Sequence, residues 1–175
     1  MDMDYVTITV PKELADKALK KGVDLEELII TTLIEKLGLD PSEVVRLRIE
    51  LAEKSLNEAK GYIGKGDAVQ ASEKLYKAVE ECIKALAEKY RIPEREEAYR
   101  EGRWWTRLLS RAAKTLSRKL NQPIIDIAWS KAYDLHTWGF HEASLEIKHV
   151  EIDVPYIEQL LEKTKQLTKT DPRNG

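Results

Sequence analysis

A row of basic residues between Glu101 and Asp126 is the feature of the sequence best suited to chemistry. This stretch holds six basic residues and no acidic one. On a helix, at about 100° per residue, five of the six share an arc of about 80°: Arg103, Arg107, Arg111, Lys114 and Arg118. Guanidinium groups bind phosphates through paired hydrogen bonds, and the neighbouring Trp104 is suited to stack on a base.

The row therefore predicts an anion-binding face for a nucleotide or RNA. This hypothesis requires that the folded protein leave the row free of carboxylates. Two alternatives stay open: a solvated face, or a face paired with acidic residues of 134–162 or of another subunit.

A second group of residues, near 135–142, combines imidazole, aromatic and carboxyl side chains. It forms a candidate pocket of Trp104, His136, Trp138, His141 and Glu142. Two histidines beside a carboxylate are suited to acid–base work. The alternative is a packed aromatic cluster. A metal site would need ligands from two elements and follows none of the usual spacings, so we predict no metal, no cofactor and no assigned catalytic residue.

The composition limits the classes of protein. The chain has 175 residues with 29 basic and 31 acidic ones, a net charge of −2, so it is not a polycation. The single cysteine, Cys82, excludes an internal disulfide and is expected to be a buried thiol. No apolar run reaches the ~20 residues of a membrane helix. We expect a cytoplasmic protein without membrane contact, with a composition compatible with a thermophilic source.

Residues 1–40 predict a strand followed by two helices. Val6, Ile8 and Val10 alternate with threonines, which is typical of a strand over 5–10. Helices are expected over 11–21 and 24–37. This order resembles the ribbon-helix-helix pattern, which implies that two chains pair their strands. The alternative is an arm on the helical body. Five basic against nine acidic residues give this segment a net charge of −4, which disfavours DNA contact.

Residues 41–170 predict a helical bundle, and 171–175 a frayed tail. Helical spacing over 42–63 and 67–90, with a glycine turn between them, indicates an antiparallel hairpin. The charged stretch 91–101 is expected to be a loop. Helices are expected over 103–120 and 123–137. Residues 141–152 fit neither period, and a last helix is expected from Asp153 and Pro155.

The hairpin residues 44–90 resemble the first two helices of HEPN domains. Together with Trp104-Trp105 and the stretch Leu135-His-Thr-Trp-Gly-Phe-His-Glu142, the chain resembles the archaeal PaREP family, a HEPN-like group. The resemblance implies an all-α, up-and-down HEPN-like bundle that dimerises, with a short N-terminal strand–helix–helix arm. HEPN ribonucleases place an arginine a few residues before a histidine, and this chain has no such pair.

The resemblance thus favours a non-catalytic binding protein. It implies a homodimer, with a nucleotide, RNA or a nucleotidyltransferase-type protein as partner. Two alternatives stay open. One is a divergent nuclease or metal-dependent hydrolase built on His136, His141 and Glu142. The other is a structural assembly partner with no ligand.

Overall fold

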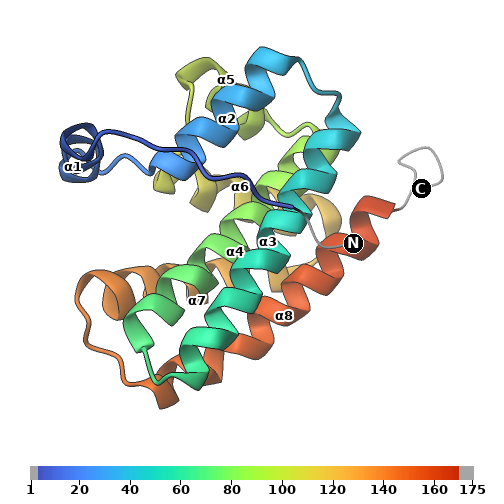
Figure 1. Ribbon diagram of the computed structural model, residues 1–175. Coiled ribbons are helices and arrows are strands. Elements are labelled where there is room, and N and C mark those ends of the chain that lie inside the picture. Colours follow the sequence, from blue (N-terminus) through green and yellow to red (C-terminus); the bar gives the residue numbers. More distant parts are fainter. Residues whose placement is uncertain (1–3, 170–175) are drawn as a thin grey trace. The chain divides into compact units, whose positions relative to one another are not determined.

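The computed structural model describes residues 4–169, and these residues are all-α (Figure 1). The described residues contain no β-strand, which confirms the predicted all-α class but not the strand expected in the N-terminal arm. It divides into two compact units, Met1–Asp40 and Pro41–Gly175. The expected frayed tail 171–175 lies outside the described residues. The helices, in order, are α1 (Lys12–Lys20), α2 (Leu25–Leu37), α3 (Pro41–Gly64), α4 (Ala68–Tyr90), α5 (Pro93–Glu101), α6 (Thr106–Leu120), α7 (Pro123–Asp134), the π-helix η1 (Leu135–His141) and α8 (Ile147–Lys169).

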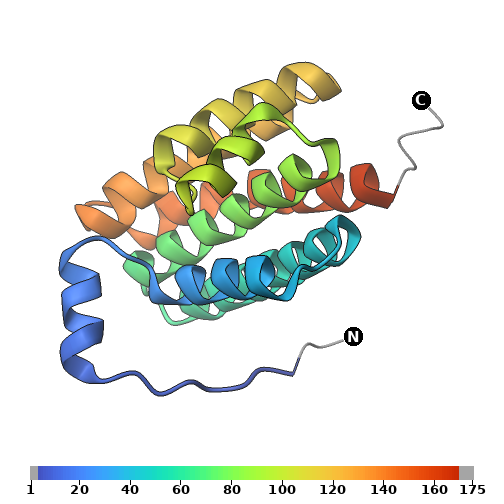
Figure 2. The same cartoon turned by 90° about the horizontal axis from the view of Figure 1, so that it is seen from above.

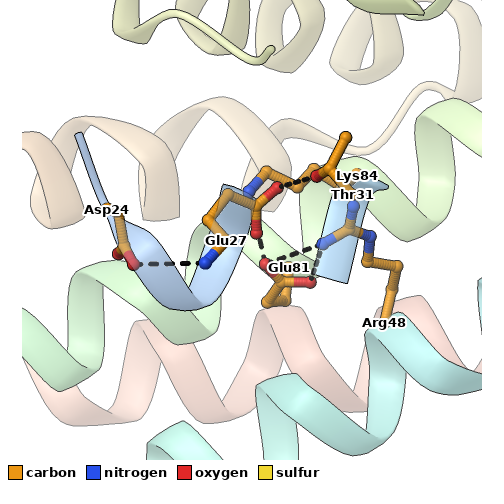
Figure 3. Close-up of polar contacts among 6 residues, drawn as sticks. All are labelled: Asp24, Glu27, Thr31, Arg48, Glu81 and Lys84. Atoms are coloured by element: carbon orange, nitrogen blue, oxygen red, sulfur yellow. Dashed lines mark hydrogen bonds and ion pairs between the residues drawn. The ribbon is translucent and has the colours of Figure 1, made fainter. Parts of the chain in front are cut away.

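In the first unit, the strand expected over 5–10 is not formed. These residues are extended and belong to neither a helix nor a sheet. The physical reason is that a strand needs a second strand to satisfy its backbone groups, and the described chain offers none. Asp24 caps helix α2, because its side chain accepts a hydrogen bond from the Glu27 backbone N–H at 3.2 Å (Figure 3).

The second unit is organised around α4. As Figure 2 shows, α4 lies between α3 on one side and α6 and α7 on the other, and it also contacts η1 and α8. Its residues from Leu75 to Glu88 are almost all buried, including the alanines that let neighbouring helices approach. The predicted α3–α4 hairpin is confirmed: Gly66 turns the chain with a φ of 72°, and Asp67 caps α4 through the Gln70 N–H.

The expectation of a loop over 91–101 is wrong, because Pro93–Glu101 form helix α5. Pro93 occupies its first turn, where a missing N–H costs nothing, and Ile92 and Ala98 are buried beside it. The helix is held mainly by polar contacts, since buried Glu94 accepts a hydrogen bond from Thr115 at 2.8 Å. Apolar periodicity could not reveal it, because its inward side chains are largely charged.

The chain between α7 and α8 also differs from expectation. Gly139 does not break the helical path but lies inside η1, and α8 begins at Ile147, before the predicted start. The His149 imidazole accepts a hydrogen bond from the Glu146 N–H at 3.1 Å and so caps this start. Pro155 therefore lies inside α8, where its missing N–H removes one helical hydrogen bond.

Two groups of buried charges lie around α4. Arg48 of α3 donates to the Glu81 carboxylate at 3.0 Å, and Lys84 lies 3.3 Å from the same carboxylate (Figure 3). Further along, Glu88 accepts two hydrogen bonds from the Arg95 guanidinium, at 2.6 and 2.8 Å, and one from the Tyr99 hydroxyl. Charges in such positions need partners, because an unpaired buried charge is costly.

Candidate functional site

The basic row lies on the outer face of α6. The opposite face is buried against the bundle and consists of Leu108, Leu109, Ala112, Ala113 and Leu116. This packing fixes the rotation of the helix, so that the basic side chains from Arg107 to Arg118 point away from the core. The predicted separation of an apolar and a cationic face is therefore present over Thr106–Leu120.

Three cations of the row meet carboxylates on neighbouring helices. Arg107 lies 3.7 Å from Glu101, Arg111 lies 3.1 Å from Glu97 of α5, and Lys114 lies 3.1 Å from Asp126 of α7. The side chains of these three cations are 70%, 55% and 64% exposed, so all three pairs are in contact with water. The requirement that the row stay free of carboxylates is therefore met only in part.

The two ends of the row are different. At one end, the Arg103 guanidinium carbon lies 3.5 Å from the centre of the Trp105 ring, and that of Arg107 lies 5.5 Å from it. At the other end, the Arg118 side chain has no ion-pair or hydrogen-bond partner within residues 4–169. The row thus has a cation–aromatic stack at its start and a free guanidinium near its end.

Trp104 was expected to be the ring available for stacking beside the basic row, but the structure places Trp105 there. Trp104 packs against the core and Trp105 is the partly exposed one, although helical spacing from Arg103 predicts the reverse. The reason is that α6 begins only at Thr106, with Trp105 at the N-cap in an extended conformation. A 100° spacing does not apply before that point, so the ring available for stacking is Trp105.

The histidines lie on η1, beside α4. His136 Nδ1 lies 3.1 Å from a carboxylate oxygen of Glu73, and His141 Nε2 lies 2.9 Å from His136 Nε2. The His136 ring also stacks on Tyr76, with 4.0 Å between centroids. His136 and His141 are five residues apart, a spacing that a π-helix brings to one side. Glu142 was expected to be the carboxylate beside the two histidines. In the structure the carboxylate that contacts His136 belongs to Glu73.

The hydrogen bonds define how protons are held in this cluster. An ionised Glu73 only accepts, so His136 donates from Nδ1 and its Nε2 accepts when the ring is neutral. His141, an exposed residue, then donates from Nε2, which leaves a lone pair on its Nδ1. This Glu73–His136–His141 chain is suited to take a proton at His141 and to stabilise the resulting charge.

The rest of the predicted pocket is not assembled. Trp138 is exposed, and no ring contact or hydrogen bond joins Trp104 to either histidine in the described chain. Tyr76 lies behind His136 instead. Burial and the nearby Glu80 carboxylate raise the pKa of Tyr76 well above its ordinary value.

Gly139 sets how closely η1 approaches α4. A Cβ atom added there would lie 2.1 Å from Ser72 Oγ and 2.6 Å from Ser72 Cβ. Ser72 is fully buried, and its hydroxyl has no hydrogen-bond partner. The glycine is therefore required by packing, and this contact holds His136 and His141 at the surface of α4.

Three other observations concern the described residues. Cys82 is fully buried, and burial raises the pKa of its thiol to about 12, so it is not poised as a nucleophile. No helix within residues 4–169 combines the length and apolar character that a membrane crossing requires. In the same part of the chain, no three histidine, cysteine or acidic side chains are arranged to hold a metal ion.

The second unit is an all-α bundle. It combines the buried central helix α4, the π-helix η1 that carries the two histidines, and the cationic outer helix α6. The chain matches the model of the archaeal PaREP1/PaREP8 family over residues 47–161, more than half of its length, and it belongs to this family. This confirms the family expected from the sequence. A crystal structure of a protein from Sulfolobus solfataricus is similar at 37% identity and a TM-score of 0.59, covering 66% of this chain and 94% of that one. No curated protein matches the chain.

Proposed function

We propose that this protein is a non-catalytic binding protein that holds a phosphate-bearing ligand, a nucleotide or RNA, on the outer face of α6. The observation that carries the proposal is the excess of exposed cations on this face. Six basic residues lie between Arg103 and Lys119, and the described ion pairs match only three of them with carboxylates. The remaining positive charge belongs to Arg118 and Lys119 on α6 and to Arg103, three residues before the helix begins.

The relative strength of the contacts supports this reading. Exposed ion pairs such as those of Arg107, Arg111 and Lys114 contribute about 0–1 kcal/mol each. A phosphate that accepts two hydrogen bonds from a guanidinium forms a charge-assisted contact about twice as strong as a neutral one. Arg107 and Arg118 are separated by about 16 Å along the helix, at 1.5 Å per residue. Such a length suits several phosphates of one strand.

The stack at the start of α6 adds a means of holding a base. Trp105 already carries Arg103 on its ring at 3.5 Å, and it remains partly exposed. Single-stranded nucleic acids are bound by cationic grooves together with aromatic platforms, at about 1–3 kcal/mol per stacked base. We therefore infer single-stranded RNA as the preferred form of ligand.

Reversing two charges of the row tests the proposal. Replacing Arg107→Glu and Arg111→Glu together should weaken binding of a short fluorescein-labelled single-stranded RNA at least about tenfold, because two phosphate contacts become repulsive. The measurement is fluorescence anisotropy at about 50 mM salt, where such contacts are least screened.

The matched control is Lys60→Glu with Lys148→Glu. Lys60 and Lys148 are exposed and pair with Glu158 and Glu146. Their replacement by glutamate changes the net charge of the protein by the same amount as the α6 double variant. The control should bind like the parent. Equal weakening in both double variants, or unchanged binding in the α6 variant, would count against a site on this face.

Acid–base cleavage of RNA is a second candidate, favoured by the hydrogen bonds that join Glu73, His136 and His141. Nδ1 of His141 would take the proton of the 2′-hydroxyl as its oxygen attacks the adjacent phosphorus and the P–O5′ bond breaks, with water protonating the departing 5′-oxygen. His136 and Glu73 would stabilise the charge on His141. The described residues provide no cluster suited to a metal ion, so cleavage without metal is the version to test.

In this second candidate, His141→Gln should lower the rate of RNA cleavage in EDTA by about a hundredfold or more, as expected for loss of a general base. Glu73→Gln should lower it less and shift the pH profile, because the carboxylate acts through His136. Lys148→Gln, an exposed change elsewhere on the second unit, serves as the control. A parent that cleaves no RNA, or a His141→Gln variant as active as the parent, rejects this candidate.

A further inference from the structure

Arg103 is the cation of the basic row whose guanidinium already lies on an aromatic ring. Its Cζ atom lies 3.5 Å from the centre of the Trp105 ring, a distance at which the guanidinium must lie flat on the indole. Arg107 is farther from the same ring, at 5.5 Å, and lies 3.7 Å from Glu101. Within residues 4–169, no carboxylate forms an ion pair with Arg103. Its charge is therefore unmatched while its plane is held in place.

The backbone on both sides of this stack is fixed by the two helices that it joins. At the end of α5, Gly102 turns the chain with a φ of 69°, and the Arg103 N–H donates to the Ala98 carbonyl at 3.1 Å. At the start of α6, the Trp105 carbonyl accepts a hydrogen bond from the Leu109 N–H at 2.9 Å. The stack is thus formed before a ligand arrives, so little conformational entropy is lost when a ligand uses it.

The spacing of the stack decides which surface a base can use. At 3.5 Å the guanidinium and the indole are already in van der Waals contact, so a base does not fit between them. The hydrogen bonds of a guanidinium lie in its plane, which leaves its faces for flat aromatic groups. Unstacked bases of RNA bind to guanidinium planes as well as to aromatic side chains. The face of Arg103 directed away from Trp105 is therefore the surface suited to a base.

We propose that Arg103 is the residue that holds a base, and that Trp105 is the positioning residue behind it, in the order indole, guanidinium, base. This inference rests on the proposed binding of RNA along α6. The edge of the same guanidinium keeps its N–H donors, which point in the plane of the group toward a phosphate that flanks the stacked base. Arg103 thus holds both parts of one nucleotide, the base on its face and the phosphate at its edge.

This contact separates nucleic acids from other polyanions. The cations from Arg107 to Arg118 contact phosphates and would bind any chain that carries them. Only the contact at Arg103 requires a base, and it selects no sequence because every base has a π-face. The ligand class is therefore a strand with an unpaired base at the Arg103 end of the row.

Removing the bases from the RNA tests this contact separately from the phosphate contacts. The two ligands are a short fluorescein-labelled single-stranded RNA and a fully abasic ribose-phosphate strand of the same length, which keeps every phosphate. In fluorescence anisotropy, the parent should bind the RNA about tenfold more tightly than the abasic strand, as expected for one stacked base. Arg103→Lys should bind the two strands within about twofold of each other, because lysine keeps the charge but has no plane.

Arg118→Lys is the matched control, because the Arg118 guanidinium lies on no aromatic ring in the described chain, and it should keep the preference of the parent. Trp105→Ala should reduce the preference, because Arg103 loses its support. An Arg103→Lys variant with the preference of the parent overturns the inference, and so does a parent that binds both strands equally, although phosphate binding at α6 then stands. A parent that binds neither strand rejects the proposed function and this inference together.

Discussion

Replacing Gly139 by alanine should lower the free energy of unfolding by about 3 kcal/mol, at the upper end of what overpacking a core costs. The added Cβ would lie 2.1 Å from Ser72 Oγ and 2.6 Å from Ser72 Cβ. Rotation of the serine side chain can move Oγ but not Cβ, so η1 must move away from α4. The measurement is urea unfolding followed by circular dichroism.

Two variants make this prediction specific. Ser72→Gly removes both clashing atoms, so in combination with Gly139→Ala it should recover most of the loss, apart from about 1 kcal/mol for a glycine inside α4. Gly61→Ala is the matched control, because Gly61 is helical and its added Cβ meets nothing within 4 Å. That change should stabilise slightly. A Gly139→Ala variant as stable as the parent would contradict the close approach of η1 to α4.

Replacing Glu88 by alanine should cost about 3–5 kcal/mol, because it removes the partner of a partly buried arginine. The Glu88 side chain is 5% exposed and accepts both hydrogen bonds of the Arg95 fork as well as one from Tyr99. This hydrogen bonding with Glu88 is the main reason that the pKa of Arg95 is raised. Without Glu88, the arginine and the Tyr99 hydroxyl lose their common acceptor, and α5 loses its tie to α4.

Glu96→Ala is the control for this prediction, because Glu96 contacts the same arginine from a side chain that is 64% exposed. Its loss should cost no more than about 0.5–1 kcal/mol. Thermal unfolding of both variants compares the stability lost with a buried carboxylate and the stability lost with an exposed one, where both carboxylates contact the same arginine. Similar losses in the two variants would contradict the assignment of Glu88 as the structural partner.

The sequence was most informative where local patterns suffice. The α3–α4 hairpin follows from apolar residues at helical spacing, and the caps of α2 and α4 follow from Asp24 and Asp67 with their partners three residues later. These signals lie within one helix or one turn. The family resemblance, carried by residues in the same hairpin and in 135–142, is also confirmed.

The errors concern features that depend on contacts between distant residues. Helix α5 has few apolar residues, and it is held by Glu88 and Thr115 from other helices, which no local period reveals. The π-helix η1 brings His136 and His141 together. The carboxylate that contacts His136 comes from Glu73, far away in the chain. The carboxylates that meet the basic row likewise come from other helices, Glu97 and Glu101 from α5 and Asp126 from α7.

Part of the candidate site was predictable and part was not. The cationic face of α6 follows from the spacing of Arg107, Arg111, Lys114 and Arg118, because one helix contains these four residues. The role of Trp105 was missed, since it depends on α6 beginning at Thr106 rather than at Arg103. Helical spacing could not decide between the two tryptophans, because both precede Thr106, the first residue of α6.

The most direct test of phosphate binding at α6 is the salt dependence of RNA binding by the unaltered protein. The logarithm of the binding constant for a labelled single-stranded RNA, plotted against the logarithm of salt concentration, should fall with a slope of about −2 to −3, as expected when three or four phosphates are neutralised. Binding that does not change with salt, or no binding at about 50 mM salt, would contradict a phosphate-binding role for this helix.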